Sequence, residues 1–261
     1  MIRVGVNGCI GKMGSIICYK ILHENDIVLT EAFERSNSES IGMDLGLVLG
    51  IEEWKLNIKE LKNSENYKMD IIVDFSSEEG FLNSLEYSFS HKIPFISGTT
   101  GISEKSIKKM KEYSKNIPIL YSSNMSTGIN SILKGLEKMK DILNDRKRDI
   151  EIIEYHHNKK KDSPSGTALM IAKKISELTK RNINRNGSVT FPRGDEIRIH
   201  SLRLGEIYGY HKIIISGNGE TIEISHSALS RETFANGVIE SIRFLIDKKE
   251  GLYSILDIER R

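Results

Sequence analysis

The opening residues combine a strand, a glycine-rich turn and a helix, and this order restricts the possible fold more than any other stretch. Residues 2–7 are β-type, Gly8, Gly11 and Gly14 follow, and an apolar helical pattern begins at Ile16. Glycines in this context predict a dinucleotide-binding loop, because they let the backbone approach a pyrophosphate at the helix N-terminus. The spacing is G-x-x-G-x-x-G, so a plain glycine turn is the alternative.

A second predicted strand, residues 27–33, runs into an acidic residue, Glu34, which Arg35 follows. An acid at this place accepts hydrogen bonds from the adenosine ribose hydroxyls of NAD. Arg35, or Lys12 in the glycine turn, could instead pair with the 2′-phosphate of NADP. These residues therefore predict use of NADH, NADPH or both.

Strands and helices continue to alternate beyond this point. Predicted strands cover residues 70–75, 94–97 and 117–121, with helices at about 79–91 and 103–114. The alternation predicts a parallel, doubly wound sheet, which binds ligands at the carboxyl ends of its strands. Gly98–Thr100 and Ser122–Met125 lie at such ends, although either can be an ordinary turn. Residues 36–68 carry no readable pattern.

The second half is mostly β-type and predicts a separate α+β domain. A helix at about 129–143, a strand at 150–155 and a helix at about 165–178 precede β-type runs at residues 188–191, 196–203, 206–216 and 220–226. Asn218-Gly219 predicts a hairpin turn between the last two runs. We expect a mixed, largely antiparallel sheet with one open face, and pairing of that face with other copies in a homo-oligomer.

The helical tail, residues 231–247, carries an apolar stripe formed by Ile239, Ile242, Leu245 and Ile246. Such a stripe is most often core, and we assign it to the first domain. The predicted fold class is therefore α/β, with a Rossmann-type dinucleotide-binding domain at residues 1–126 and 231–261. An α+β domain at residues 127–230 would bind substrate and form the oligomer contacts. Arg231 could reach the cofactor or lie at a surface turn.

Residues 154–167 (E-Y-H-H-N-K-K-K-D-S-P-S-G-T) carry the strongest chemical signal. His156 and His157 fall where the predicted strand ends. Ser163 is expected to cap the next helix, with Pro164 in its first position. The helix start would then offer a socket for an anion, made by the N–H groups of Ser165, Gly166 and Thr167. Taken alone, the stretch also fits a solvated surface loop.

Composition narrows the class of protein. The 261 residues include 38 basic and 36 acidic side chains, a balance that does not suggest a nucleic-acid binder. We see no apolar run of the ~20 residues that span a bilayer, and the β-type opening leaves no signal peptide. Cys9 and Cys18 suggest neither a disulfide framework nor a metal site. We therefore expect a cytoplasmic protein without membrane, nucleic-acid or metal partners.

Several of these motifs together resemble the 4-hydroxy-tetrahydrodipicolinate reductase (dihydrodipicolinate reductase) family of bacterial lysine biosynthesis. The resemblance covers essentially the whole chain: V-N-G-C-I-G-K-M-G, Glu34-Arg35, Asp74-Phe75-Ser76, Gly98–Gly101, residues 154–167 and Ser230–Ala235. The E-x-H-H…K-x-D-x-P-S-G-T pattern is highly specific, whereas the glycine turn is not. The family implies a Rossmann domain completed by the C-terminal helix, an α+β substrate domain and a homotetramer.

The resemblance also implies roles for individual residues. His156 would be the general acid/base and Lys160 a second proton donor. The small dicarboxylate substrate would lie on His157, Lys160, Ser165, Gly166 and Thr167. NADH or NADPH would lie on Gly8, Cys9, Ile10, Gly11, Lys12, Met13, Glu34, Arg35, Gly98, Thr99, Thr100, Ser122, Ser123, Asn124 and Met125, with Arg231 as a further candidate.

The chain departs from the family pattern at three positions. Lys12 stands where arginine is common, which would weaken a 2′-phosphate contact. Met125 replaces a common aromatic residue, and Ser163 a common alanine. Two other functions stay open: a reductase of the same architecture for another amino-acid-derived imine or aldehyde, and a non-catalytic dinucleotide-binding regulator. Substrate profiling would distinguish a reductase for another substrate from a member of this family. Cofactor binding without turnover of any imine would favour the regulator.

Overall fold

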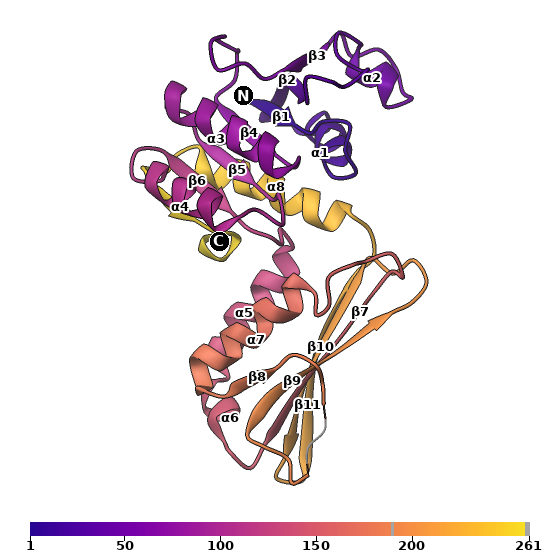
Figure 1. Cartoon of the computed structure of the whole chain (residues 1–261), viewed down its shortest axis with the longest axis vertical. Helices are drawn as coiled ribbons and strands as arrows, with labels where there is room; N and C mark the ends of the chain where they lie inside the picture. The colour runs from indigo at the N-terminus through magenta and orange to yellow at the C-terminus, as the bar shows by residue number, and fades with distance from the viewer. Residues whose placement is uncertain (189–190, 259–261) are drawn as a thin grey trace. The chain divides into compact units, whose positions relative to one another are not determined.

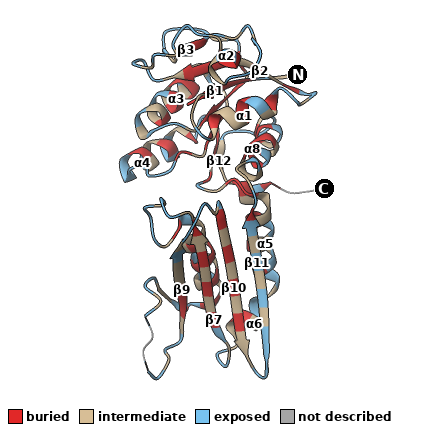
Figure 2. Ribbon diagram, turned by 90° about the vertical axis from the view of Figure 1, so that its right-hand side faces the viewer, coloured by how far each residue is buried: buried red, intermediate tan, exposed pale blue. Residues whose placement is uncertain are grey.

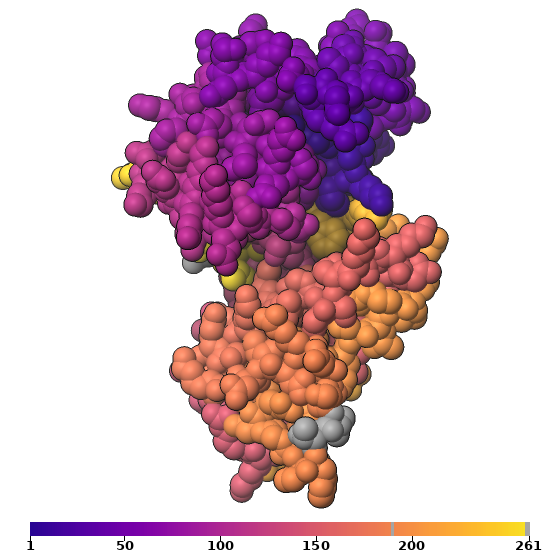
Figure 3. Space-filling view, in the orientation of Figure 1, coloured from indigo at the N-terminus to yellow at the C-terminus, as the bar shows by residue number. Residues whose placement is uncertain are grey.

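The computed structural model describes residues 1–188 and 191–258, which form two compact units. The first unit comprises Met1–Met125 and the residues from Phe234 onward, and the second is Ser126–Thr233. In Figure 3, yellow atoms of the C-terminal residues emerge beside magenta atoms of the first unit. The chain therefore leaves the first unit after Met125 and returns to complete it.

The first unit is built on a seven-stranded sheet with every pairing parallel, as the alternation predicted. The order is β12-β6-β5-β4-β1-β2-β3. The strands are β1 (Ile2–Asn7), β2 (Ile27–Glu34), β3 (Ile58–Glu60), β4 (Ile71–Asp74), β5 (Phe95–Ser97), β6 (Pro118–Tyr121) and β12 (Gly251–Tyr253). The chain reverses direction across the sheet at β1, between β4 and β2, which is where such sheets bind ligands.

Helices pack against this sheet (Figure 1) and enclose two apolar clusters. They are α1 (Gly14–Ile21), α2 (Leu45–Val48), α3 (Glu78–His91), α4 (Glu104–Tyr113) and α8 (Glu232–Leu245), with a short 3₁₀ turn at Ile255–Asp257. Ser77 caps α3 and Ser103 caps α4, each accepting a backbone N–H of its helix. The predicted stripe on α8 is core, since Ile239, Ile242 and Leu245 are buried beside α1.

The segment without a readable pattern forms α2 and the edge strand β3. Asp44 organises it, because its carboxylate accepts hydrogen bonds from the backbone N–H groups of Leu47, Trp54 and Leu56. These bonds lower the pKa of Asp44 against the opposing effect of its desolvation. One side chain thus replaces the regular ladder bonds that a sequence pattern would have revealed.

The second unit has a five-stranded mixed sheet of order β11-β10-β7-β9-β8. Antiparallel pairs join β10 to β11 and β7, and parallel pairs join β9 to β7 and β8. The strands are β7 (Asp149–His156), β8 (Asn182–Asn184), β9 (Glu196–Arg203), β10 (Gly209–Gly217) and β11 (Glu220–Ala228). Figure 2 shows buried positions alternating with half-buried ones along β7 and β10, so one face of the sheet is covered and the other is more open.

The described residues of this unit also form the helices α5 (Thr127–Lys138), α6 (Lys140–Asn144) and α7 (Gly166–Thr179). The single helix predicted at about 129–143 was wrong, because the backbone leaves the α-helical conformation at Met139 (φ −96°, ψ 14°). The apolar spacing of Leu136 and Leu143 continues across the break, and both are buried. That continuity explains why the sequence predicted one helix.

The predicted hairpin is confirmed, since Asn218 and Gly219 both have positive φ between β10 and β11. Strand β10 begins at Gly209, three residues later than predicted. The run at residues 188–191 includes 189 and 190, which lie outside the described residues. Within the described ranges, no helix is long and apolar enough to cross a membrane.

Candidate functional site

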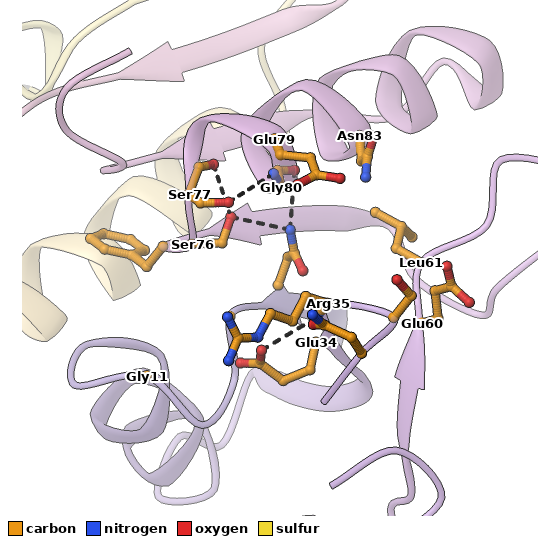
Figure 4. Close-up of a pocket in the computed structure, with 15 residues that line it drawn as sticks. Gly11, Glu34, Arg35, Glu60, Leu61, Ser76, Ser77, Glu79, Gly80 and Asn83 are labelled. Atoms are coloured by element: carbon orange, nitrogen blue, oxygen red, sulfur yellow. Dashed lines mark hydrogen bonds between the residues drawn. The ribbon is translucent and has the colours of Figure 1, made fainter. Parts of the chain in front are cut away.

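In the first unit, a pocket of about 540 Å³ opens at the carboxyl ends of the parallel strands. The last residues of three strands line it: Asn7 of β1, Glu34 of β2 and Glu60 of β3. Gly8, Gly11 and Arg35 also line it, so it collects four residues of the predicted cofactor set. Figure 4 shows Glu34 and Arg35 on one side and Ser76 and Ser77 on the other.

The glycine turn below this pocket requires glycine at two positions. Gly8 has φ +78°, in the left-handed region that glycine adopts freely. A Cβ on Gly14 would lie 2.0 Å from the Gly8 carbonyl oxygen, so only glycine lets α1 begin this close to the turn. The Ile10 N–H donates to Glu34 Oε1 at 3.3 Å, which holds the acidic side chain beside the turn.

A fully buried carboxylate, Asp74, ties the strand ends around the pocket together. It accepts hydrogen bonds from Ser76 Oγ (2.5 Å), Thr99 Oγ1 (2.6 Å), Ser97 Oγ (3.1 Å) and Asn7 Nδ2 (3.0 Å). Burial raises the pKa of Asp74 to about 6, although these hydrogen bonds favour the charged form. The donors come from β1, β5 and the loops after β4 and β5, so one carboxyl group fixes the edge that lines the pocket.

The remaining predicted cofactor residues of this unit fall into different environments. Cys9 and Met125 are part of the apolar core, and burial raises the pKa of the Cys9 thiol to about 12. Thr99 is buried and its hydroxyl donates a hydrogen bond to Asp74, whereas Ser122 Oγ donates to the Asn124 carbonyl (2.7 Å). Three residues are exposed: Lys12, Thr100 and Ser123. The half-buried ones are Ile10, Met13, Gly98 and Asn124.

In the second unit, Glu154 and His156 face the covered side of β7. Glu154 is fully buried, and its Oε2 lies 2.6 Å from His156 Nδ1. Arg203 of β9 binds the same carboxylate with two nitrogens, at 3.0 and 3.1 Å. Burial acts to raise the pKa of Glu154, but the hydrogen bonds from His156, Arg203 and Ser165 outweigh it and lower the pKa to about 2. The predicted proton donor therefore stands beside an ionised carboxylate.

The start of α7 differs from the prediction. Ser165 is the N-cap: its Oγ accepts the Ala168 N–H at 3.2 Å, and the helix begins at Gly166. Ser163 and Pro164 lie before this cap, so their predicted roles were wrong. The Ser165 N–H donates to Glu154 Oε1 at 3.1 Å and cannot be part of an anion socket. Gly166 and Thr167 therefore supply the first two N–H groups at the positive end of α7.

The loop that carries the lysines is anchored at both ends. The N–H groups of His157 and Asn158 donate to the carbonyls of Ile207 and Gly205. Lys160 Nζ lies 2.8 Å from Asp162 Oδ1, and this ion pair lowers the pKa of Asp162 although burial opposes it. The Lys160 side chain is 23% exposed.

A second histidine packs against the first. The rings of His156 and His211 lie 5.2 Å apart in an edge-to-face arrangement, and His211 Nε2 is 3.2 Å from Ser165 Oγ. Burial and the charge of His156 lower the pKa of His211 to about 3, so His211 is neutral at neutral pH. Its ring supplies shape and a neutral hydrogen-bonding edge beside Ser165.

Arg231 belongs to the second unit, where its guanidinium lies over the Tyr208 ring at 5.3 Å. Nowhere in residues 1–188 or 191–258 do three or more histidine, cysteine, aspartate or glutamate side chains form a group that could hold a metal ion.

Sequence reasoning missed three residues of these clusters: Asn7, Arg203 and His211. Asn7 is the last residue of β1 and could have been found by its position at a strand end. Arg203 is also the last residue of its strand, but its pairing with Glu154 depends on the parallel register of β7 and β9. His211 lies within a strand, and no sequence pattern indicates its contact with His156.

The fold defines the class: two units, the first built on a Rossmann-type parallel sheet and the second on a mixed sheet. The WlbA dehydrogenase from Thermus thermophilus shares this fold, with a TM-score of 0.61, 11% identity, and coverage of 97% of this chain and 90% of that one. The family models "Dihydrodipicolinate reductase, N-terminus" and "Dihydrodipicolinate reductase, C-terminus" match residues 2–125 and 128–258. The chain belongs to the dihydrodipicolinate reductase family, as its motifs predicted.

Curated relatives match over nearly their whole length. The 4-hydroxy-tetrahydrodipicolinate reductase of Buchnera aphidicola subsp. Schizaphis graminum is 37% identical, covering 98% of this chain and 96% of the relative. That of Methanocaldococcus jannaschii is 37% identical, covering 99% and 97%. A structure of the dipicolinate-bound dihydrodipicolinate reductase from Paenisporosarcina sp. TG-14 has a TM-score of 0.77, 24% identity and coverage of 99% and 100%. The chain is accordingly an enzyme of the oxidoreductase class.

The pKa of Asp74 leads to a test of how its network contributes to stability. A carboxyl with a folded-state pKa of about 6 and an unfolded value of about 3.9 binds more protons when folded between these pH values. Its contribution to the free energy of unfolding should therefore decrease by about 2 kcal/mol as pH rises from 4 to 7. Asp74→Asn removes this titration, and denaturant unfolding of both proteins across this range measures the difference. Parallel pH dependences would contradict the assignment.

Proposed function

We propose that the chain reduces 4-hydroxy-tetrahydrodipicolinate to tetrahydrodipicolinate with NADH or NADPH, a step of diaminopimelate and lysine biosynthesis. One observation carries the proposal: Glu154 accepts hydrogen bonds from both His156 and Ser165, the N-cap residue of α7. The Glu154 carboxylate thereby fixes the proposed proton donor, His156, beside the positive N-terminal end of α7. The family membership supplies the substrate, and the names of the relatives agree with it.

The first unit, with residues 1–126 and 231–261 as the proposed domain, would hold the cofactor in its pocket. Gly8 and Gly11 let the backbone approach the pyrophosphate, and Glu34 at the end of β2 would accept the ribose hydroxyls. Arg35 lines the same pocket and offers a cation to a 2′-phosphate. Both cofactors therefore fit these residues. When bound, the reduced nicotinamide supplies a hydride from its C4 atom.

The second unit, proposed as residues 127–230, would hold the dicarboxylate. Gly166 and Thr167 offer backbone N–H groups at the N-terminus of α7, and Lys160 and His157 come from the adjacent loop. Carboxylates are favoured at helix N-termini because the backbone dipoles point at them. The Paenisporosarcina relative binds dipicolinate, which agrees with a planar dicarboxylate as the ligand of such a site.

His156 would act as the proton donor. Reduction of a conjugated cyclic imine requires one proton for each hydride, with loss of the 4-hydroxyl as water. The imidazole ring is the side chain that most often transfers protons in enzymes at neutral pH, which suits this role. The ammonium group of Lys160, whose side chain is partly exposed, would bind a carboxylate, stabilise developing charge and serve as the second donor.

We further propose that the chain forms a homotetramer by pairing of the open face of the second sheet between copies, and that it works in the cytoplasm. Tyr155 of β7 and Tyr210 of β10 stack on it with ring centroids 4.3 Å apart, and Leu202 of β9 is 45% exposed beside Tyr155. Covering aromatic and aliphatic side chains with a second sheet removes apolar surface from water and so stabilises the association of the two copies.

A coupled assay tests the activity. Pyruvate, aspartate semialdehyde and the synthase that condenses them generate the unstable substrate in place, and loss of NADH or NADPH absorbance is followed. We expect oxidation of the cofactor only when the synthase is present, and the two rates rank the cofactors. If the protein binds NADH but oxidises neither cofactor, the regulator replaces this proposal. If it oxidises them only with another imine or aldehyde, the substrate is wrong.

Replacing His156 tests the proton donor. His156→Gln should lower kcat about 100-fold or more and leave NADH affinity nearly unchanged, because general acid catalysis contributes on that scale. Steady-state kinetics in the coupled assay and calorimetric NADH titration provide the two readouts. His200→Gln is the matched control: this histidine also pairs with a glutamate of β7, Glu151, but outside the cluster of His156. Unchanged turnover of the His156 variant would remove this residue from the mechanism.

A further inference from the structure

Glu154 holds together three elements of the second unit, and this inference rests on the function proposed for His156. It is fully buried, and its two oxygens accept hydrogen bonds from His156 Nδ1, the Arg203 guanidinium and the Ser165 N–H. These donors belong to β7, β9 and the cap of α7. Removing a carboxylate from water costs free energy, and an apolar side chain would fill the same space without that cost. The charge and the donors around Glu154 therefore suggest a role beyond packing.

The bond to His156 determines which ring nitrogen carries a proton. An ionised carboxylate can only accept hydrogen bonds, so His156 Nδ1 must donate at 2.6 Å. In the neutral ring the proton then stays on Nδ1, and Nε2 is the atom that gains and loses one. A Cβ on Gly209 would lie 3.0 Å from Nε2, so glycine at this position leaves that nitrogen uncovered.

Arg203 extends the arrangement to the loop that carries Lys160. Besides its two bonds to Glu154, it donates to the Asp162 carbonyl oxygen at 2.5 Å. The Asp162 carboxylate in turn forms the ion pair with Lys160. The guanidinium also offsets the charge of Glu154, which lets the carboxylate stay ionised in a buried place.

We propose that Glu154 is a positioning residue for the reduction: it fixes the Nδ1–H form and the orientation of His156 relative to the start of α7. Through Arg203 it also holds the loop of Lys160 against the same carboxylate. The proton donor, the helix N-terminus and the lysine loop are thereby kept in one geometry. After Nε2 gives its proton to the substrate, Nδ1 retains its own and water can restore the lost one.

Strand β7 contains a matched pair that serves as a control. Glu151 also binds a histidine and an arginine, His200 and Arg193, but its side chain is 25% exposed. It lies outside the Glu154 cluster. Glu151→Gln therefore removes the same charge and the same kind of contact from the same strand without touching the proposed donor.

The kinetic test combines two substitutions. Glu154→Gln should lower kcat about tenfold or more, because an amide nitrogen facing Nδ1 favours the wrong tautomer, while Glu151→Gln should change kcat less than about twofold. In a His156→Gln background, Glu154→Gln should have little further effect on kcat, since it acts through that ring. Independent, multiplying effects would show a merely structural role and overturn the proposal.

A measurement on the unaltered protein covers the case in which Glu154→Gln does not fold. The ¹⁵N chemical shifts of the His156 ring at alkaline pH report the tautomer of the neutral imidazole directly. We expect the Nδ1-protonated form, and the Nε2-protonated form would overturn the proposal. This result does not depend on turnover, so it stands apart from the coupled assay: failure of the assay alone would refute the function, not the positioning.

Discussion

A buried carboxylate must find donors, and this requirement organises both units. Asp74 is the last residue of β4, and Glu154 lies near the end of β7; both are fully buried. Each would cost several kcal/mol if left without partners, so neighbouring strands and loops must supply hydroxyl, amide, guanidinium or backbone donors. The candidate cofactor pocket is built around the first carboxylate, and the candidate proton donor and anion socket around the second.

The two carboxylates differ in pKa because their donors differ. Asp74 is met by three hydroxyls and one amide, all neutral, and burial raises its pKa to about 6. Glu154 is met by Arg203, a histidine and a backbone N–H, and its pKa is lowered to about 2. The ionised carboxylate of Glu154 stabilises a proton on the neighbouring ring of His156.

The parts of the fold that follow local rules could be predicted from the sequence. The turn at Gly8 and Gly14 was predicted because few residues allow that backbone, and the parallel sheet because strands and helices alternate. The cap of α7 was predicted wrongly. Two serines flank Pro164, and only the bond from the Ser165 N–H to Glu154, eleven residues earlier in the chain, decides between them. The partnership of Arg203 with Glu154 likewise depends on strand register, which local sequence patterns do not carry.

The central claim is that this chain moves a hydride from a nicotinamide to the ring of a dicarboxylate. The most direct measurement uses NADH or NADPH carrying deuterium at both C4 positions, with the substrate generated in place and the product examined by mass spectrometry. The account predicts a product one mass unit heavier than the product of the unlabelled cofactor, with the deuterium on a ring carbon. Turnover that yields an unlabelled product would contradict direct hydride transfer and, with it, the proposed reduction.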